Sequence, residues 1–226
     1  MIETVLFDYV NTIAFLRPSR EDILIEYFKK ERDILLLKED ASELYTKLDE
    51  KHHYSSVTIR SAPEKKAFYD EYNKIIFGEL QGGDHSSYYD FYRSVMKRWV
   101  LDESTLEVFN FLKNRGITIG ILSNFDENLE EVLKTLGIRD MLDFIFVSAK
   151  IGLEKPDIKF YECAKNMYNI DVDRTIYVGD SYTLDYLPSR KVGLISYLID
   201  RNNVNLKTEN KIQDLNEIIR MVADVT

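Results

Sequence analysis

Several features that help to classify a protein are scarce in this sequence of 226 residues. It holds only four prolines and a single cysteine, Cys163. Because a disulfide needs two cysteines, an intramolecular disulfide is excluded. It has no apolar run long enough to span a bilayer and no pattern typical of a signal peptide. We therefore expect a cytoplasmic protein with no membrane partner.

Basic residues are also in deficit. Lysine and arginine number 30 against 39 acidic residues, which gives a formal net charge of -9 and a pI near 5.0. This balance does not provide the positive surface that attracts nucleic acid, so we expect no nucleic-acid partner. Hydrophobic residues make up 45% of the chain and aromatic residues 12%, which is enough to build a folded core.

Short apolar runs alternate with helical patterns over much of the chain, and these runs predict strands. The predicted strands cover residues 2–7, 117–122, 144–147, 175–178 and 194–199. Such alternation predicts an α/β fold with a Rossmann-like parallel sheet and helices on both faces. Functional residues of such folds gather at the carboxyl ends of the strands.

Helix boundaries are marked by a few local signals between these strands. Ser104 and Glu107 have the spacing of a capping box, which predicts a helix start. Pro156 and Pro188 suit the first turns of two later helices. Proline has no backbone N–H, and in the first turn of a helix this group would have no partner within the helix.

The segment 15–98 breaks the alternation. Its apolar residues follow helical spacing and it contains no good strand, so we expect an all-helical module inserted after the first strand. The predicted organisation is an α/β core of residues 1–14 and 99–226 with a helical cap of residues 15–98. A lid over the end of the first strand is the natural use of such an insert.

Polar residues capable of chemistry follow the predicted strands, all at one edge of the sheet. Three carboxylates at this edge would repel one another unless a cation intervenes. Mg²⁺ suits a site that offers a few oxygen ligands beside a phosphate, and a lysine or a serine hydroxyl can hold phosphate oxygens. The candidates are Asp8, Ser123, Asn124, Lys155, Asp180 and Asp185.

Four short motifs in this order resemble those of the haloacid dehalogenase superfamily, and the match spans the chain. The helical insert between the first two motifs resembles the first type of cap in that superfamily, and the dehalogenase-like hydrolases are the most similar subfamily. The motifs are Asp8 to Thr12, Leu122-Ser123-Asn124, Lys155-Pro156, and Gly179-Asp180 with Asp185.

The resemblance implies a hydrolase that acts on a small phosphorylated molecule. Asp8 would attack phosphorus and form an aspartyl-phosphate, which water then hydrolyses. Ser123, Asn124 and Lys155 would hold the phosphoryl oxygens. Thr12 would hydrogen-bond locally and orient the loop after Asp8.

The resemblance also implies a Mg²⁺ site. Asp8, the backbone carbonyl of Val10 and Asp180 would ligate the ion, and Asp185 would be a further ligand or support the others. The cation would neutralise charge on the transferring phosphoryl group.

One position departs from the pattern of the phosphatases. They place an aspartate two residues after the nucleophile, as the acid that protonates the leaving group, and here that residue is Val10. The glycine that usually follows is Asn11. Because the metal ligand at this position is a backbone carbonyl, the change spares the metal site and removes the acid, which typically costs about 10² to 10⁴ in rate.

Three interpretations stay open. The first is a phosphatase that is slow, takes an acid from the cap, or prefers acyl and aryl phosphates. The second is a 2-haloacid dehalogenase, which Val10 permits; Asp180, Asp185 and the lack of an arginine near Glu39 speak against it. The third is a weakly catalytic binding module on the same fold.

Two clusters in the helical insert are weaker candidates. His52 and His53 could supply an acid, but adjacent residues of a helix point to different faces, which favours a surface position. The aromatic residues between Tyr88 and Trp99 could line a substrate pocket, although such clusters more often form a core.

Overall fold

The computed structural model describes residues 1–52, 54–59, 61–203, 205, 207–208 and 210–223. The chain forms two compact units. Met1–Phe15 with Trp99–Thr226 make up the first, here called the α/β unit, and Leu16–Arg98 make up the second, here called the helical unit. Among the described residues, no helix is both long enough and apolar enough to cross a membrane.

The α/β unit is built on a parallel sheet of six strands in the order β5-β4-β1-β6-β7-β8. β1 lies between β4 and β6, so Phe7 is in register with both Ile121 and Val178. This result confirms the predicted α/β fold with a Rossmann-like parallel sheet. The strands are β1 (Thr4–Phe7), β4 (Thr118–Ser123), β5 (Phe144–Val147), β6 (Thr175–Gly179), β7 (Ile195–Ile199) and the unpredicted β8 (Lys211–Ile212).

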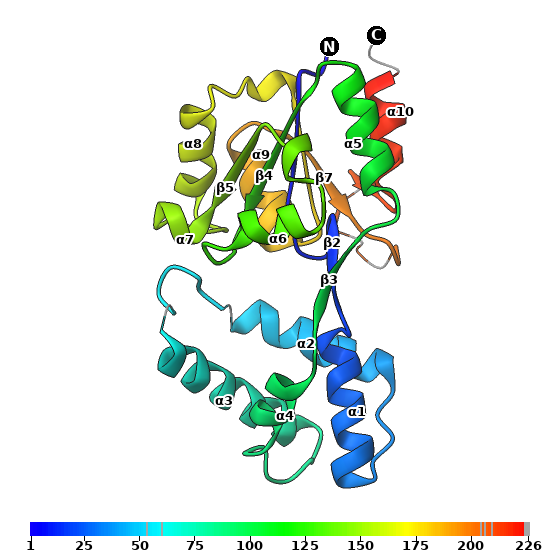
Figure 1. The fold of residues 1–226 in the computed structure, drawn as a ribbon, viewed down its shortest axis with the longest axis vertical. Coiled ribbons are helices and arrows are strands. Elements are labelled where there is room, and N and C mark those ends of the chain that lie inside the picture. Colours follow the sequence, from blue (N-terminus) through cyan, green and yellow to red (C-terminus); the bar gives the residue numbers. More distant parts are fainter. Residues whose placement is uncertain (53, 60, 204, 206, 209, 224–226) are drawn as a thin grey trace. The chain divides into compact units, whose positions relative to one another are not determined.

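Helices cover both faces of this sheet (Figure 1). Val5 and Phe7 point to the face that packs against Phe109, whereas Leu6 points to the face that packs against Phe160. The alternation follows from the period of two in a strand and leaves every β1 side chain from Val5 to Phe7 buried. The helices are α5 (Thr105–Asn114), α6 (Leu129–Thr135), α7 (Ser148–Ile151), α8 (Ile158–Met167), α9 (Leu187–Lys191) and α10 (Glu217–Ala223).

The predicted helix starts have mixed outcomes. Pro188 lies in the first turn of α9, as predicted. Pro156 instead precedes α8, whose N-cap is Asp157. The predicted capping box at Ser104 is wrong, because the Ser104 hydroxyl donates to Asp214 Oδ1 at 2.9 Å and leaves the helix start without a side-chain cap.

The helical unit has a core of its own, in which apolar side chains of its helices pack together. Ser19 and Ser61 cap α1 and α3 through capping boxes, which fix where these two helices begin. The helices are α1 (Arg20–Arg32), α2 (Lys38–Lys51), α3 (Ala62–Glu79) and α4 (Tyr88–Ser94). At the two boundaries between the units the chain forms short strands that the sequence did not predict, and β2 (Ala14–Arg17) pairs there with β3 (Arg98–Leu101).

Candidate active site

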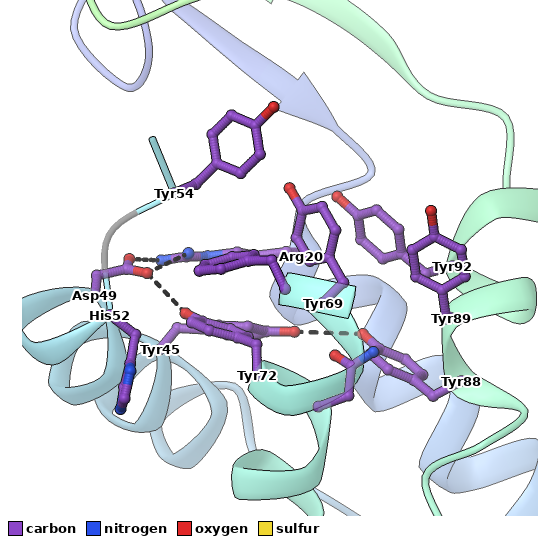
Figure 2. A pocket seen from close by; sticks show the side chains of 12 residues that line it. Arg20, Tyr45, Asp49, His52, Tyr54, Tyr69, Tyr72, Tyr88, Tyr89 and Tyr92 are labelled. Atoms are coloured by element: carbon purple, nitrogen blue, oxygen red, sulfur yellow. Dashed lines mark hydrogen bonds and ion pairs between the residues drawn. The ribbon is translucent and has the colours of Figure 1, made fainter. Parts of the chain in front are cut away.

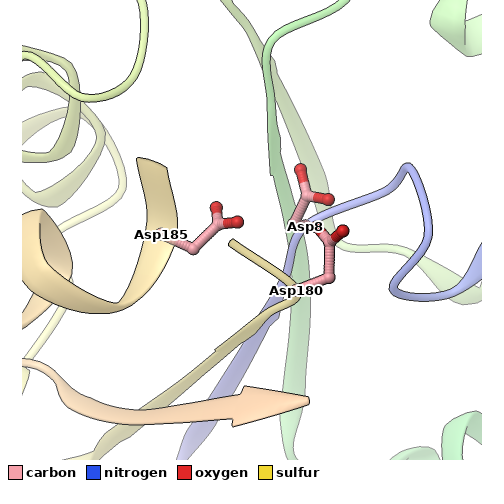
Figure 3. A group of neighbouring side chains, drawn as sticks. All are labelled: Asp8, Asp180 and Asp185. Atoms are coloured by element: carbon pink, nitrogen blue, oxygen red, sulfur yellow. The ribbon is translucent and has the colours of Figure 1, made fainter. Parts of the chain in front are cut away.

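Three aspartates gather at the carboxyl edge of the sheet (Figure 3). Asp8 follows β1 and Asp180 follows β6, its neighbour, while Asp185 lies in η3 (Tyr182–Tyr186), a turn of π-helix after β6. Each offers a carboxylate oxygen within 4.8 Å of the others. Parallel strands end at the same edge, so residues far apart in sequence meet here.

Lys155 joins two of these aspartates. Its Nζ donates to Asp8 Oδ1 and to Asp185 Oδ1, at 2.6 Å in each case. All three side chains are almost fully buried, with Lys155 only 4% exposed. A buried ion cluster of this kind holds its members in fixed positions, because breaking any pair would leave a buried charge unpaired.

Asp185 is the most heavily hydrogen-bonded of the aspartates. Tyr177, a residue of β6, donates its hydroxyl to Asp185 Oδ1 at 2.6 Å, and the Ser181 N–H donates to Oδ2 at 3.0 Å. A side chain at Gly179 would bring its Cβ to 2.4 Å from Asp185 Cγ, so glycine is required there. Both oxygens of Asp185 are therefore already engaged within the protein.

The charges at this site do not balance, since three carboxylates face one lysine. Burial raises the pKa of Asp8 to about 6 against the effect of Lys155. Burial, followed by the charges of Asp8 and Asp185, raises the pKa of Asp180 to about 8. Although burial disfavours its charged form, Asp185 and Asp8 keep the pKa of Lys155 above its ordinary value. The carboxylate oxygens of this cluster, with their excess of negative charge, thus fit a hard divalent cation.

Ser123, at the end of β4, has a hydroxyl that is buried without a hydrogen-bond partner in the described part of the chain. An unpaired buried hydroxyl is costly unless a ligand satisfies it, so it is suited to an oxygen of a bound anion. Thr12 donates its hydroxyl to Asp8 Oδ2 at 3.3 Å. Both side chains were singled out from the sequence.

Asn124 faces the loop that carries Lys155. Its Oδ1 accepts from the Lys155 backbone N–H at 2.8 Å, and its Nδ2 donates to the Lys155 carbonyl at 2.9 Å. Both ends of the amide are therefore used to hold the backbone of Lys155. This geometry points to positioning of the lysine rather than direct contact with a substrate.

The loop after Asp8 makes a tight turn at Asn11, whose φ is 58°. Asparagine tolerates this left-handed conformation, so the turn forms although the residue is not the glycine that the motif's resemblance led us to expect. The turn leaves Val10 two residues after Asp8 with a side chain that has no titratable group.

Sequence reasoning missed two polar residues around this site. Tyr177 looked like an apolar core residue of a strand, and only its hydroxyl hinted at a polar partner. Arg201 lies after β7 and donates to the carbonyls of Asn11 and Thr12 at 2.6 and 2.7 Å. Nothing in the sequence around Arg201 indicates a partner 189 residues away.

Comparison with known proteins yields one consistent family. A family model described as haloacid dehalogenase-like hydrolase matches residues 2–193. The chain is 29% identical over 143 residues to haloacid dehalogenase-like hydrolase domain-containing protein 3 of Xenopus laevis, covering 61% of this chain and 58% of the relative. It is 26% identical over 125 residues to glyceraldehyde 3-phosphate phosphatase of Methanocaldococcus jannaschii, covering 51% and 55%.

The matched segment therefore spans little more than half the length of these curated relatives. Among solved structures, a HAD phosphatase from Thermococcus onnurineus aligns with a TM-score of 0.64 and 19% identity, covering 98% of both chains. At this identity the likeness shows a shared fold.

Proposed function

This chain belongs to the haloacid dehalogenase-like hydrolase family, and we propose that it is a Mg²⁺-dependent phosphatase of small phosphorylated molecules. The observation that carries the proposal is the buried pair of Asp8 and Lys155 beside Asp180 and the unpartnered hydroxyl of Ser123. This arrangement offers a nucleophile, a cation site and an anion-binding donor together. The similarity to a phosphatase of Methanocaldococcus jannaschii supports the same reaction class.

In the proposed reaction the Asp8 carboxylate attacks phosphorus. The new bond joins an Asp8 oxygen to phosphorus while the bond to the leaving oxygen breaks and that oxygen takes the electron pair. Water then attacks the aspartyl-phosphate, releases inorganic phosphate and regenerates the Asp8 carboxylate. Lys155 orients Asp8 through its hydrogen bond, and Ser123 donates its hydroxyl to a phosphoryl oxygen.

Asp8, Asp180 and the backbone carbonyl of Val10 would hold the Mg²⁺ ion. The bound cation supplies positive charge that offsets the negative charge of the phosphoryl group and of the aspartates. Asp185 has both oxygens occupied by protein donors, so we assign it the positioning of Lys155 in preference to metal ligation. Asn124 positions Lys155 by accepting a hydrogen bond from its backbone N–H. Thr12 positions Asp8 by donating its hydroxyl to the carboxylate.

Val10 shapes the expected substrate preference. With no acid two residues after Asp8, a leaving group that is stable as an anion reacts best, because it needs no proton. Aryl phosphates and acyl phosphates meet this condition, and alkyl phosphate esters do not. We therefore expect higher kcat/KM for aryl and acyl phosphates than for alkyl phosphates.

The experiment is a substrate screen with three classes of phosphate and with 2-haloacids, each in the presence of Mg²⁺ or of EDTA. Phosphate release that needs Mg²⁺ and Asp8 and favours aryl or acyl phosphates supports the proposal. Halide release in EDTA would replace it with the dehalogenase interpretation. A chain that turns over none of these compounds would fit the binding-module interpretation instead.

A further inference from the structure

The helical unit contains a cavity of about 120 Å³ that is lined by none of the residues assigned to the proposed reaction. We call it the tyrosine cavity, because tyrosines from three helices line it (Figure 2). Tyr45 comes from α2, Tyr72 from α3, and Tyr88, Tyr89 and Tyr92 from α4. Among the aromatic residues near α4 that were considered from the sequence, Phe91 and Trp99 are not part of its lining.

The walls of the tyrosine cavity are held in place by contacts among themselves. The rings of Tyr45 and Tyr72 stack with centroids 6.2 Å apart and planes 21° apart. The Tyr45 and Tyr88 hydroxyls lie 3.3 Å from each other. The guanidinium of Arg20 lies over the Tyr45 ring at 4.3 Å from its centroid. A site with such mutually fixed walls needs little rearrangement to bind a ligand.

The charges that line this cavity cancel. Arg20 forms a two-pronged ion pair with Asp49 through both terminal nitrogens. Asp49 also accepts a hydrogen bond of 2.7 Å from the Tyr72 hydroxyl. The guanidinium and the carboxylate therefore satisfy each other, and no excess charge favours an ionic ligand.

One side-chain amide lines the cavity. Asn73, in α3, lines the cavity with only 5% of its surface exposed. Within the described part of the chain, no donor or acceptor is bonded to its side-chain amide. Because this amide lines the cavity and is not used by the protein, a ligand that carries a hydroxyl or an amide can pair with it there.

From these observations we propose that the tyrosine cavity binds an uncharged, single-ring aromatic molecule that carries a hydrogen-bonding group, of which phenol is the simplest. The ring packs against the tyrosine faces, and the polar group pairs with the Asn73 amide. The volume of about 120 Å³ is on the same scale as that of an engineered protein cavity of about 150 Å³ that binds benzene, so a ligand of one ring is the expected size. This site goes beyond the proposed reaction and needs neither Asp8 nor Mg²⁺.

The test is a titration of the ¹⁵N-labelled 226-residue chain with phenol, monitored by NMR at the side-chain amide of Asn73 and at the backbone amides of Tyr72 and Tyr88, which remain in every variant. Cyclohexanol and toluene are the control ligands, because the first keeps the hydroxyl without the aromatic ring and the second keeps the ring without the hydroxyl. We expect a saturable shift for phenol with a Kd of about 1 mM, and binding at least about tenfold weaker for both controls. The Asp8→Asn variant without Mg²⁺ should bind phenol as the wild type does, which separates this proposal from the proposed function.

Two variants complete the test. Asn73→Leu should weaken phenol binding about tenfold and remove the preference for phenol over toluene. Asn114→Leu, which makes the same change at an exposed position of α5, should leave both unchanged. The proposal is overturned if phenol gives no saturable shift, if cyclohexanol binds as well as phenol, or if folded Asn73→Leu keeps the preference. The comparison of ligands on the wild type decides the matter even if Asn73→Leu does not fold.

Discussion

Each unit of this protein contains an aspartate that accepts a hydrogen bond from a tyrosine and an ion pair from a basic residue. In the α/β unit this aspartate is Asp185, with Tyr177 and Lys155 as donors. Only 3% of the Lys155 side chain and 2% of that of Asp185 are exposed. Here the same lysine also holds Asp8, and Asp180 adds a third carboxylate, so negative charge is in excess.

The counterpart in the helical unit is Asp49, with Tyr72 and Arg20 as donors. Its ion pair is 37% exposed at the arginine and 45% at the aspartate, and its two charges cancel. An aspartate, a tyrosine and a basic residue, which is a lysine in one unit and an arginine in the other, thus form part of two different sites. An excess of buried carboxylate favours a cation and a phosphoryl group, whereas a balanced pair beside tyrosine rings favours an uncharged ligand.

The largest effect should follow from Asp8→Asn. Because an amide cannot act as the nucleophile, phosphatase activity should fall by at least about 10⁴, while the tyrosine cavity is unaffected. Phosphate release measured under saturating Mg²⁺ tests the first part. Activity that persists in Asp8→Asn would eliminate the covalent mechanism.

Restoring an acid beside the nucleophile should give the next largest effect. In Val10→Asp, turnover of alkyl phosphates should rise by about 10² or more, because the leaving oxygen can now be protonated. Aryl phosphates should gain much less, so the ratio of the two rates is the informative measurement. The matched control is Val10→Asn, which adds a polar side chain of similar size without an acid. Equal rates for Val10→Asp and the wild type would count against the role assigned to this position.

Removing the basic residue from each ion pair compares the two units directly. Lys155→Met should lower the free energy of unfolding by about 3–5 kcal/mol, since it leaves buried carboxylates without a counter-charge. Arg20→Met should lower it by about 1 kcal/mol or less, because water can reach that pair. Urea denaturation of the metal-free chain at pH 8 measures both. Similar losses for the two variants would show that the contrast in burial has no energetic consequence.

The smallest predicted effect is a pH dependence confined to the α/β unit. Because the pKa values of Asp8 and Asp180 are raised to about 6 and about 8, the metal-free folded state holds protons that the unfolded chain releases near pH 4. This contribution to stability is therefore lost as the pH rises from about 4 to about 8. Mg²⁺ must displace the same protons, so its affinity should increase from pH 6 to pH 8. For each proton that binding displaces, the affinity should rise by about tenfold per pH unit.

Isothermal titration with Mg²⁺ at pH 6, 7 and 8 measures this dependence. Asp180→Asn should weaken Mg²⁺ binding and flatten its pH profile together, since one residue provides both the ligand and a titrating group. A Mg²⁺ affinity that is constant over this range would contradict the electrostatic picture of the site.

Much of the α/β unit follows from local pattern. Runs of apolar residues predicted five of its strands, because a strand buried on both faces needs apolar side chains at every position. The polar residues at the ends of these runs were predicted to share one edge, and Asp8, Asp180 and Asp185 do lie together there. Parallel pairing alone is enough to bring such residues together, whatever the details of packing.

Local sequence pattern did not predict the partner of a side chain that could bond either to nearby or to distant residues. Ser104 and Glu107 have capping-box spacing, yet the Ser104 hydroxyl bonds to Asp214, 110 residues away. Tyr177 and Asn73 sit in segments with ordinary strand and helix patterns, and only the fold shows that one donates to Asp185 and the other faces a cavity. His52 also lines that cavity, and His53 lies outside the described residues.

The sequence by itself thus determined the α/β fold class, the family, and the loss of the usual acid at Val10. These depend on residue type and short spacing, which are encoded along the chain. The tertiary structure alone decided that both oxygens of Asp185 accept hydrogen bonds from the protein, that Arg201 holds the turn after Asp8, and that tyrosines and Asn73 of the helical unit line one cavity. Such features depend on hydrogen-bond geometry and packing between residues distant in sequence, and these are fixed only when the chain folds.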